Sequence, residues 1–263
     1  MSKLDFQHAV LVLVLLVSLS AVARADNSQA VAYYNQGNTK YAKGDLYGPI
    51  ADYDRAIELD PQYADAYVGR GNVKMDGADY VGAIADWEKA ITLVPSWKDK
   101  LQRKIDGARS QIYVFQGNDK YKAKDFDGAI ADCSRALEIN SKNEVAYLER
   151  GNAKEAKRDY AGAIADYTQA IALSPQYDEA YNDRGAAKDT LGDYDGAIAD
   201  CTQALALSPH CTDCYYNRGI AKNDKGDYAG AIADWEEEIE WNAPRKEELL
   251  PRIDKARAKL KKD

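Results

Sequence analysis

Four cysteines and two histidines are the residues of this 263-residue chain that could carry nucleophilic, redox or metal chemistry. Cys211 and Cys214 form a C-x-x-C pair beside His210, a spacing that allows a disulfide, a free thiol pair, or a redox or metal site. His8 is the other histidine, so no Ser-His-Asp arrangement can be built. The chain also lacks the P-loop, dinucleotide and H-E-x-x-H motifs. We therefore expect a protein that is not an enzyme, with no cofactor and no metal.

The charge balance points away from nucleic acid. Thirty-five Lys and Arg against 43 Asp and Glu give a net charge of −8, which provides no basic field for phosphates. Hydrophobic residues make up 46% of the chain, enough to build a core and to exclude a disordered tail. The sequence predicts a globular or solenoid protein that does not bind nucleic acid.

Residues 1–25 differ from the rest of the chain. Residues 9–17 are an unbroken apolar run, and Ala23 and Ala25 follow in A-x-A spacing. This pattern predicts a signal peptide cleaved after Ala25; the alternative is an uncleaved anchor. No second apolar run approaches membrane-spanning length, so we expect a periplasmic or secreted protein without membrane contact after cleavage.

A 34-residue period fills the remaining sequence. Each copy has a glycine four residues after a tyrosine, and the glycines are Gly37, Gly71, Gly117, Gly151, Gly185 and Gly219. Counted from seven residues before each glycine, the repeats cover 30–63, 64–97, 110–143, 144–177, 178–211 and 212–245. Each has Asp at position 16, Gly at position 19 and Ile-Ala-Asp at positions 21–23. Such self-similarity indicates a repeat architecture.

This pattern resembles the tetratricopeptide repeat (TPR), which favours an aromatic residue at position 4, a small one at 8, Ala at 20 and Pro at 32. Five repeats have Ala at position 20 and four have Pro at position 32, whereas Pro49 takes position 20 of the first. The resemblance implies an all-α fold, an α-solenoid of six helix-turn-helix repeats in a right-handed superhelix. It also implies a concave groove lined by the first helix of each repeat.

Positions that recur in the repeats predict packing contacts. Aspartate at position 16 is placed to cap the second helix, and Pro49 falls in an opening turn, where few backbone bonds are lost. Asp at position 23 and Lys at position 11 recur in all six repeats, and Arg at position 7 in four; we expect these charges to form ion pairs between helices. Cys133 and Cys201 take position 24 on the buried face, which predicts small core residues.

Residues 98–109 interrupt the repeats, and residues 246–257 are their close copy. The end of a solenoid needs a helix that is apolar on one side only, so we expect 246–262 to be a C-terminal capping helix with a possible bend at Pro251. The inserted segment is then an inner cap that closes a two-repeat array (30–97) before a four-repeat array (110–245). The alternative is a tolerated, charged surface helix.

The inserted segment has no proline between residues 98 and 123. It is therefore expected to continue into the next repeat as one helix of roughly 25 residues, which is longer than usual for a globular protein. A bend at Gly107 or Gly117 is the competing possibility.

The expected groove has two chemical halves. In the first three repeats its positions are apolar and rich in amides, and in the last three they are acidic. The residues expected to bind a peptide are Tyr34, Asn38, Tyr41, Asn72, Met75, Asn118, Tyr121, Asn152, Glu155, Asp183 and Tyr216. This lining suits an extended peptide with apolar and basic residues; the alternative is a solvated acidic face without a ligand. The four asparagines share position 9 and are expected either to hold a peptide backbone or to bind local polar groups and water.

The sequence as a whole predicts an exported scaffold or adaptor that binds a partner protein in its concave groove. The alternative function is a thiol-redox or metal-handling protein that uses Cys211 and Cys214, with the repeats as a docking platform. Self-association through the solenoid ends is a further possibility.

Overall fold

The computed structural model describes residues 27–261. The expected signal peptide, residues 1–25, and residue 262 of the expected cap lie outside the described residues. Contacts divide the chain between Arg109 and Ser110, which coincides with the end of the inserted segment. We call 27–109 the N-terminal module and 110–261 the C-terminal module. Their described residues form helices and turns, without strands.

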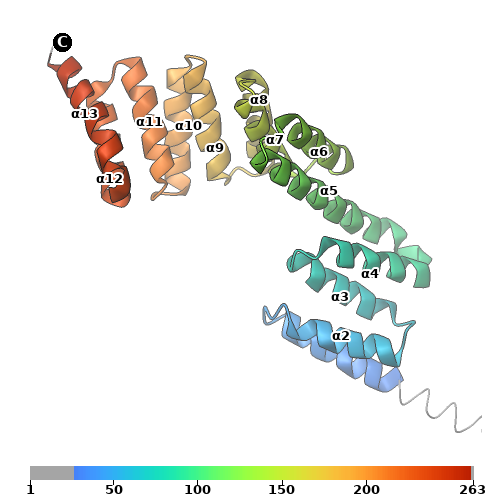
Figure 1. Ribbon diagram of the computed structural model, residues 1–263. Helices are drawn as coiled ribbons and strands as arrows, with labels where there is room; N and C mark the ends of the chain where they lie inside the picture. The colour runs from blue at the N-terminus through green and yellow to red at the C-terminus, as the bar shows by residue number, and fades with distance from the viewer. Residues whose placement is uncertain (1–26, 262–263) are drawn as a thin grey trace, which may run out of the picture. The chain divides into compact units, whose positions relative to one another are not determined.

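The N-terminal module contains two repeats and the beginning of a long helix. Its elements are a helix over residues 27–41, α2 (Gly48–Leu59), α3 (Ala64–Asp76), α4 (Tyr80–Leu93), the 3-10 helix η1 (Pro95–Trp97) and the first part of α5 (Lys98–Lys122) (Figure 1). Helix α3 contacts both α2 and α4, as expected for stacked antiparallel pairs. Pro49 lies at the start of α2, in the opening turn that the sequence predicts.

The C-terminal module contains four repeats and a terminal helix. Its elements after α5 are α6 (Phe126–Ile139), α7 (Glu144–Ala156), α8 (Tyr160–Leu173), α9 (Asp178–Thr190), α10 (Tyr194–Leu207), α11 (Thr212–Lys225), α12 (Tyr228–Trp241), η2 (Ala243–Arg245) and α13 (Lys246–Leu260). Each of α6 to α12 contacts the next helix in the chain, and α9 also contacts α7 and α11. The first helices α7, α9 and α11 of successive repeats therefore lie side by side, as a groove-forming face requires.

Helix α5 is one helix of 25 residues, so the prediction of a continuous helix is confirmed and Gly107 and Gly117 do not end it. Leu101 and Ile105, on its first part, are buried against Trp87 of the N-terminal module. From Ser110 onward the helix serves as the first helix of the third repeat. Ser110 is buried, and its hydroxyl donates to the backbone carbonyl of Ala136 in the C-terminal module.

The aspartates at position 16 end the turn between the two helices of each repeat. Their side chains accept hydrogen bonds of 2.9–3.0 Å from the backbone N–H three residues later, at Asp45, Asp79, Asp125, Asp159, Asp193 and Asp227. Five of them are the N-cap residue itself. In the first repeat the second helix, α2, begins two residues later than in the others, and Tyr47 is its N-cap residue. The predicted caps are confirmed.

Small residues allow close packing between the two helices of a repeat. A Cβ added at Gly151 would lie 2.5 Å from the ring of Tyr167, at position 24 of the same repeat, so glycine is the residue that fits. In the third and fifth repeats the side chains at position 24 are Cys133 and Cys201, which are fully buried. Burial raises the pKa of both thiols to about 12, as expected for core cysteines.

The charges at positions 7, 11 and 23 meet around one buried aspartate in each repeat. Arg150 donates two hydrogen bonds, of 2.9 and 2.7 Å, to Asp166, and Lys154 lies 2.7 Å from the same carboxylate. The arrangement recurs at Asp86, Asp200 and Asp234, and with Lys alone at Asp52 and Asp132. Arg150 also donates to Ser134 of the preceding repeat. The predicted ion pairs between helices are confirmed.

The two related segments pack in the same way, each inside its own module. Three apolar side chains of each are buried against a tryptophan at position 24: Leu101, Ile105 and Ala108 against Trp87, and Leu249, Ile253 and Ala256 against Trp235. Helix α13 runs through Pro251, which is exposed. Both segments thus cover the apolar face of the last repeat before them.

Candidate functional site

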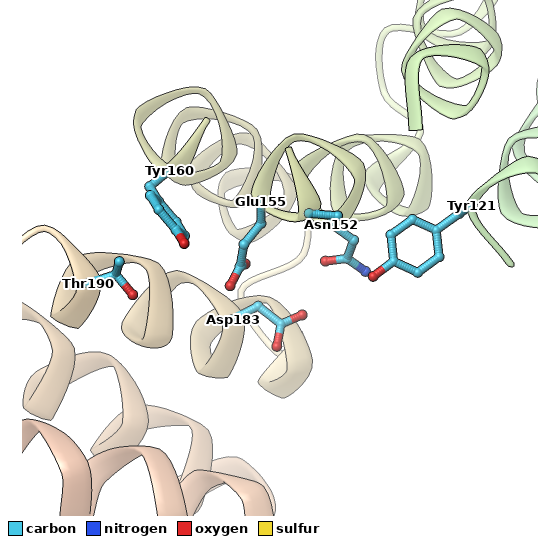
Figure 2. A pocket seen from close by; sticks show the side chains of 7 residues that line it. Tyr121, Asn152, Glu155, Tyr160, Asp183 and Thr190 are labelled. Carbon is cyan, nitrogen blue, oxygen red and sulfur yellow. The ribbon is translucent and has the colours of Figure 1, made fainter. Parts of the chain in front are cut away.

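A polar hollow of about 470 Å³ opens in the C-terminal module. We call it the acidic hollow; it is lined by Tyr121, Asn152, Glu155, Ala156, Tyr160, Asp183 and Thr190. These residues come from α5, α7, α8 and α9. In Figure 2 the Glu155 carboxylate points from α7 toward α9, where Asp183 lies, and the rings of Tyr160 and Tyr121 lie on either side. Four residues predicted from the sequence, at positions 121, 152, 155 and 183, therefore meet in one place.

The side chain of Tyr167 fixes two of these groups. It is fully buried, and its hydroxyl lies 2.8 Å from Oδ1 of Asn152 and 2.7 Å from Oε2 of Glu155. A phenol has one proton to donate, so the two acceptors share it. Burial, followed by the charge of Glu155, raises the pKa of Tyr167. The tyrosine stays neutral and holds Glu155 at the hollow.

The carboxylates of the hollow are poorly compensated. Burial, followed by the charge of Glu179, raises the pKa of Asp183 from its ordinary 3.8 to about 7, although Asn182 donates to it at 3.1 Å. Burial also raises the pKa of Glu155. Among residues 27–261, neither Asp183 nor Glu155 forms an ion pair with Lys or Arg. The hollow is a region of negative potential that lacks an internal counter-ion.

Further carboxylates extend this potential along the first helices. Burial raises the pKa of Glu149, with Glu179 adding to the shift, and burial raises that of Glu179 itself. Burial and the charge of Asp224 raise the pKa of Asp189 to about 6. Repeats four to six therefore show the acidic character that the sequence predicts for this half.

Each asparagine predicted to bind a peptide backbone has a partner inside the chain. Asn38 and Asn152 accept from the buried hydroxyls of Tyr53 and Tyr167 at 2.7 and 2.8 Å. The other two are bonded to charged groups: Asn72 accepts from Lys104 at 2.8 Å and Asn118 donates to Glu149 at 3.1 Å. The structure thus shows the local role for one polar atom of each amide, and contact with a peptide stays a prediction.

The predicted residues of the first two repeats lie in the N-terminal module. Tyr34 packs its ring against Tyr53 and Tyr63, with centroids 5.9 and 5.1 Å away. Three others line a separate hollow of about 320 Å³, the N-terminal hollow, whose lining is Tyr41, Asn72, Met75, Asp76, Trp87, Lys104 and Gly107. The Tyr41 hydroxyl donates to Asp76, and this bond is the main cause that raises the pKa of Tyr41 to about 12.

Tyr216 is engaged with the end of the chain. The guanidinium groups of Arg245 and Arg252 lie over its ring, 4.4 and 5.5 Å from the centroid, as in cation–π contacts. Arg245 also lies 2.7 Å from Glu238 and 2.9 Å from Asp213. A peptide that reached Tyr216 would have to displace these contacts.

Cys211 and Cys214 are joined by a disulfide at the start of α11. Cys211 is the N-cap residue, and its Sγ accepts from the backbone N–H of Cys214 at 3.2 Å. Cys214 is fully buried. The neighbouring His210 packs against Trp241, with ring centroids 4.2 Å apart. Within the described part of the chain, no three His, Cys, Asp or Glu side chains are grouped closely enough to hold a metal ion.

Some lining residues escaped the sequence analysis. Tyr160 is at position 17, which the pattern assigns to the apolar stripe, yet its ring borders the acidic hollow. In the N-terminal hollow, Lys104 and Gly107 come from the inserted segment. The resemblance of 98–109 to a cap was the available indication that this segment lies beside a groove position.

Across residues 27–261, no helix is both long and apolar enough to cross a membrane.

Repeated helix pairs with these caps and ion pairs define an α-solenoid repeat protein. Two family models match the sequence: "TPR repeat" over residues 37–77, and "Tetratricopeptide repeat" over residues 148–210 and 182–245. Together they cover more than half of the chain. The chain belongs to the tetratricopeptide repeat family.

One solved structure shows the same fold over most of this chain, and two shorter TPR domains match part of it. A chain of the APC/C hetero-tetramer Cut9–Hcn1 matches 92% of this chain at 18% identity with a TM-score of 0.53, and this chain spans 45% of its length. The OM64 TPR domain of Arabidopsis matches 45% of this chain and 98% of its own at 26% identity, TM-score 0.44. The first TPR domain of human RPAP3 matches 45% and 94% at 24% identity, TM-score 0.44. No curated protein matches this chain significantly in sequence.

Proposed function

We propose that the protein is a non-enzymatic scaffold that binds a partner protein through an extended basic segment, with a Lys or Arg side chain entering the acidic hollow. The observation that carries this proposal is the pair of carboxylates, Glu155 and Asp183, that face one space without a cationic partner among the described residues. Membership of a repeat family whose units stack to form extended binding surfaces supports the same function.

The chemistry of the hollow favours a cation over other side chains. Charge-assisted hydrogen bonds to carboxylates are roughly twice as strong as neutral ones, and the rings of Tyr121 and Tyr160 add faces on which a cation can rest. A volume of about 470 Å³ lies in the range of small-ligand sites. A bound ammonium or guanidinium would also relieve the repulsion between Asp183 and Glu179.

The test uses capped peptides that differ only at the central residue: Lys, Arg, norleucine or Glu. Binding is measured by isothermal titration calorimetry at low and high salt. We expect the Lys and Arg peptides to bind about 10- to 100-fold more tightly than the norleucine peptide, as one or two charged hydrogen bonds provide. This preference should weaken with salt.

The matched variants are Glu155→Gln with Asp183→Asn, and Asp119→Asn as a control on an exposed aspartate of α5. The double variant should lose the preference for Lys and Arg, while the control keeps it. Equal affinity of all four peptides, or a double variant that binds as the native protein does, would contradict the proposal.

We propose further that residues 1–25 direct export to the periplasm or the medium, supported by the apolar run and A-x-A spacing of the sequence. Mass spectrometry of the exported protein should find a chain that begins at Asp26. Replacing Ala23 and Ala25 with larger residues should leave the precursor uncleaved. A chain that keeps residue 1 in the native protein would exclude cleavage.

A further inference from the structure

The N-terminal hollow has features that the acidic hollow lacks. It lies wholly inside the N-terminal module, between the helix at 27–41, α3, α4 and the first part of α5. Its lining includes Met75 and the nearly fully buried Trp87, and a methionine adapts easily to an apolar partner. Its volume of about 320 Å³ is at the lower end for ligand sites, which fits one residue of a ligand better than a long segment.

Gly107 leaves this hollow open where a side chain would be expected. It lies inside α5, and apart from proline glycine is the poorest helix former. Close packing does not require it, because an added Cβ would meet nothing within 4 Å; at Gly71, by contrast, a Cβ would lie 2.7 Å from Trp87. In the C-terminal copy of the segment the corresponding residue is Lys255. The missing side chain therefore exposes helix backbone to the hollow without an internal reason.

The indole N–H of Trp87, beside the same hollow, is buried without a hydrogen-bond partner among the described residues. The Trp87 side chain is 1% exposed. The corresponding Trp235 donates to the carbonyl of Tyr216 at 3.4 Å. A buried donor without a partner is uncommon in proteins; this one lies against Gly71 of α3, and its residue also borders the hollow.

Opposite charges flank the apolar part of the lining. The Lys104 ammonium lies 5.5 Å from the Trp87 ring and donates to Asn72, and it has two further N–H groups. The Asp76 carboxylate accepts from Tyr41 and can accept more bonds. A peptide residue presents one carbonyl, one N–H and one side chain, which matches this set of a donor, an acceptor and an apolar lining. Because the two charges offset each other, they favour neither sign of side chain.

We propose that the N-terminal hollow is an anchor pocket for one bulky apolar side chain of a bound peptide. Lys104 holds the carbonyl of that residue and Asp76 holds its N–H, while the side chain enters beside Met75 and the backbone of Gly107. The inference rests on the proposed function in that the ligand is a peptide. It concerns another module and an uncharged residue, so the two can fail separately.

The test follows the indole N–H resonances of the ¹⁵N-labelled protein, which has four tryptophans. The probes are N-acetyl-leucinamide and N-acetyl-phenylalaninamide, with N-acetyl-glycinamide as the probe without a side chain. The Trp87 resonance, assigned with Trp87→Phe, should move saturably with the Leu and Phe probes, and the Gly probe should bind at least fivefold more weakly. The resonances of Trp235 and Trp241 should stay in place.

A matched pair of variants separates the hollow from the surface of α5. Gly107→Leu adds a side chain into open space, so it should fold and weaken the Leu probe at least tenfold. Arg103→Leu adds the same side chain at an exposed position of the same helix outside the lining, and should leave affinity unchanged. A native-like circular dichroism spectrum and dispersed Trp87 and Trp97 resonances, from the core of the N-terminal module, show that each variant is folded.

The inference is overturned if no probe moves the Trp87 resonance saturably, or if Gly107→Leu binds the Leu probe as the native protein does. Failure of the Lys and Arg peptides at the acidic hollow, with saturable binding of the Leu probe here, would refute the proposed cation site alone. The reverse result would refute the anchor pocket alone.

Discussion

Replacing Asp183 with asparagine should stabilise the C-terminal module at pH 8. The native carboxylate is buried in the acidic hollow beside Glu179, and its pKa lies near 7 instead of 3.8. The folded state therefore holds a proton on Asp183 more tightly than the unfolded state does. Above pH 7 the carboxylate is ionised in the folded state, which lowers the free energy of unfolding. The asparagine amide is uncharged and nearly isosteric, so it does not carry this penalty.

The size of the effect follows from the pKa. A difference of about 3 between the folded and unfolded pKa values corresponds to roughly 4 kcal/mol, since each pKa unit is about 1.36 kcal/mol. Asn182 already donates to the carboxylate, and part of the side chain reaches solvent. We therefore expect a gain of about 2 kcal/mol in the free energy of unfolding, or a melting temperature about 4–8 °C higher for a module of this size.

The stabilisation by Asp183→Asn should increase with pH. Because the folded pKa is raised, the penalty is fully present above pH 7 and disappears as the pH falls toward 4. Thermal and urea unfolding, followed by circular dichroism, should show the full gain of Asp183→Asn at pH 8 and only about a quarter of it at pH 4.5, where the unfolded carboxyl, of ordinary pKa 3.8, is still largely ionised. Asp119→Asn, the exposed control, should stay within about 0.5 kcal/mol of the native protein. A variant no more stable than the native protein at pH 8, or equally stabilised at both pH values, would refute the reasoning.

Three further changes test the framework that supports the hollow. Asp166→Asn should cost about 3 kcal/mol in urea unfolding because the half-buried cations Arg150 and Lys154 lose their counter-charge; a loss below about 1 kcal/mol would show the network to be dispensable. Gly151→Ala should cost about 2 kcal/mol because its Cβ meets the Tyr167 ring, and unchanged stability would contradict the close packing. Reduction of Cys211–Cys214 should cost about 2 kcal/mol, as expected for so short a loop; an unchanged melting temperature would show that the disulfide is not a staple.

The features that recur in every repeat could be predicted from the sequence, because six copies show the same residue type at the same position. Asp159 caps its helix as the corresponding aspartates do in the other repeats, and Asp166 pairs with Arg150 as in the three other repeats that have Arg at position 7. Each contact forms within one repeat, between residues a few turns apart or on two adjacent helices. A pattern of positions therefore fixes them without knowledge of the wider structure.

The chemistry of the hollows depends on residues that vary between repeats, and this is where the sequence analysis stopped. Asn152 accepts from Tyr167 because a tyrosine occupies position 24. In the third repeat that position is Cys133, which offers no such donor, and Asn118 turns to Glu149 instead. The asparagine at position 9 thus has one kind of partner in the first and fourth repeats and other partners in the second and third. Only the three-dimensional contacts decide which polar atoms remain for a ligand.

The two capping segments separate packing from specialisation within one chain. Each buries Leu, Ile and Ala against a tryptophan at the same spacing, so the requirements of the core have kept these positions alike. They differ beside the groove, where Gly107 stands in one segment and Lys255 in the other. Cation–π contacts cover Tyr216 in the C-terminal module, whereas the smaller Val68 takes the corresponding position in the N-terminal module. Core packing does not require these differences. They are therefore the positions at which binding of a specific ligand would select the residue, and in the N-terminal module they lie on the surface beside its capping segment.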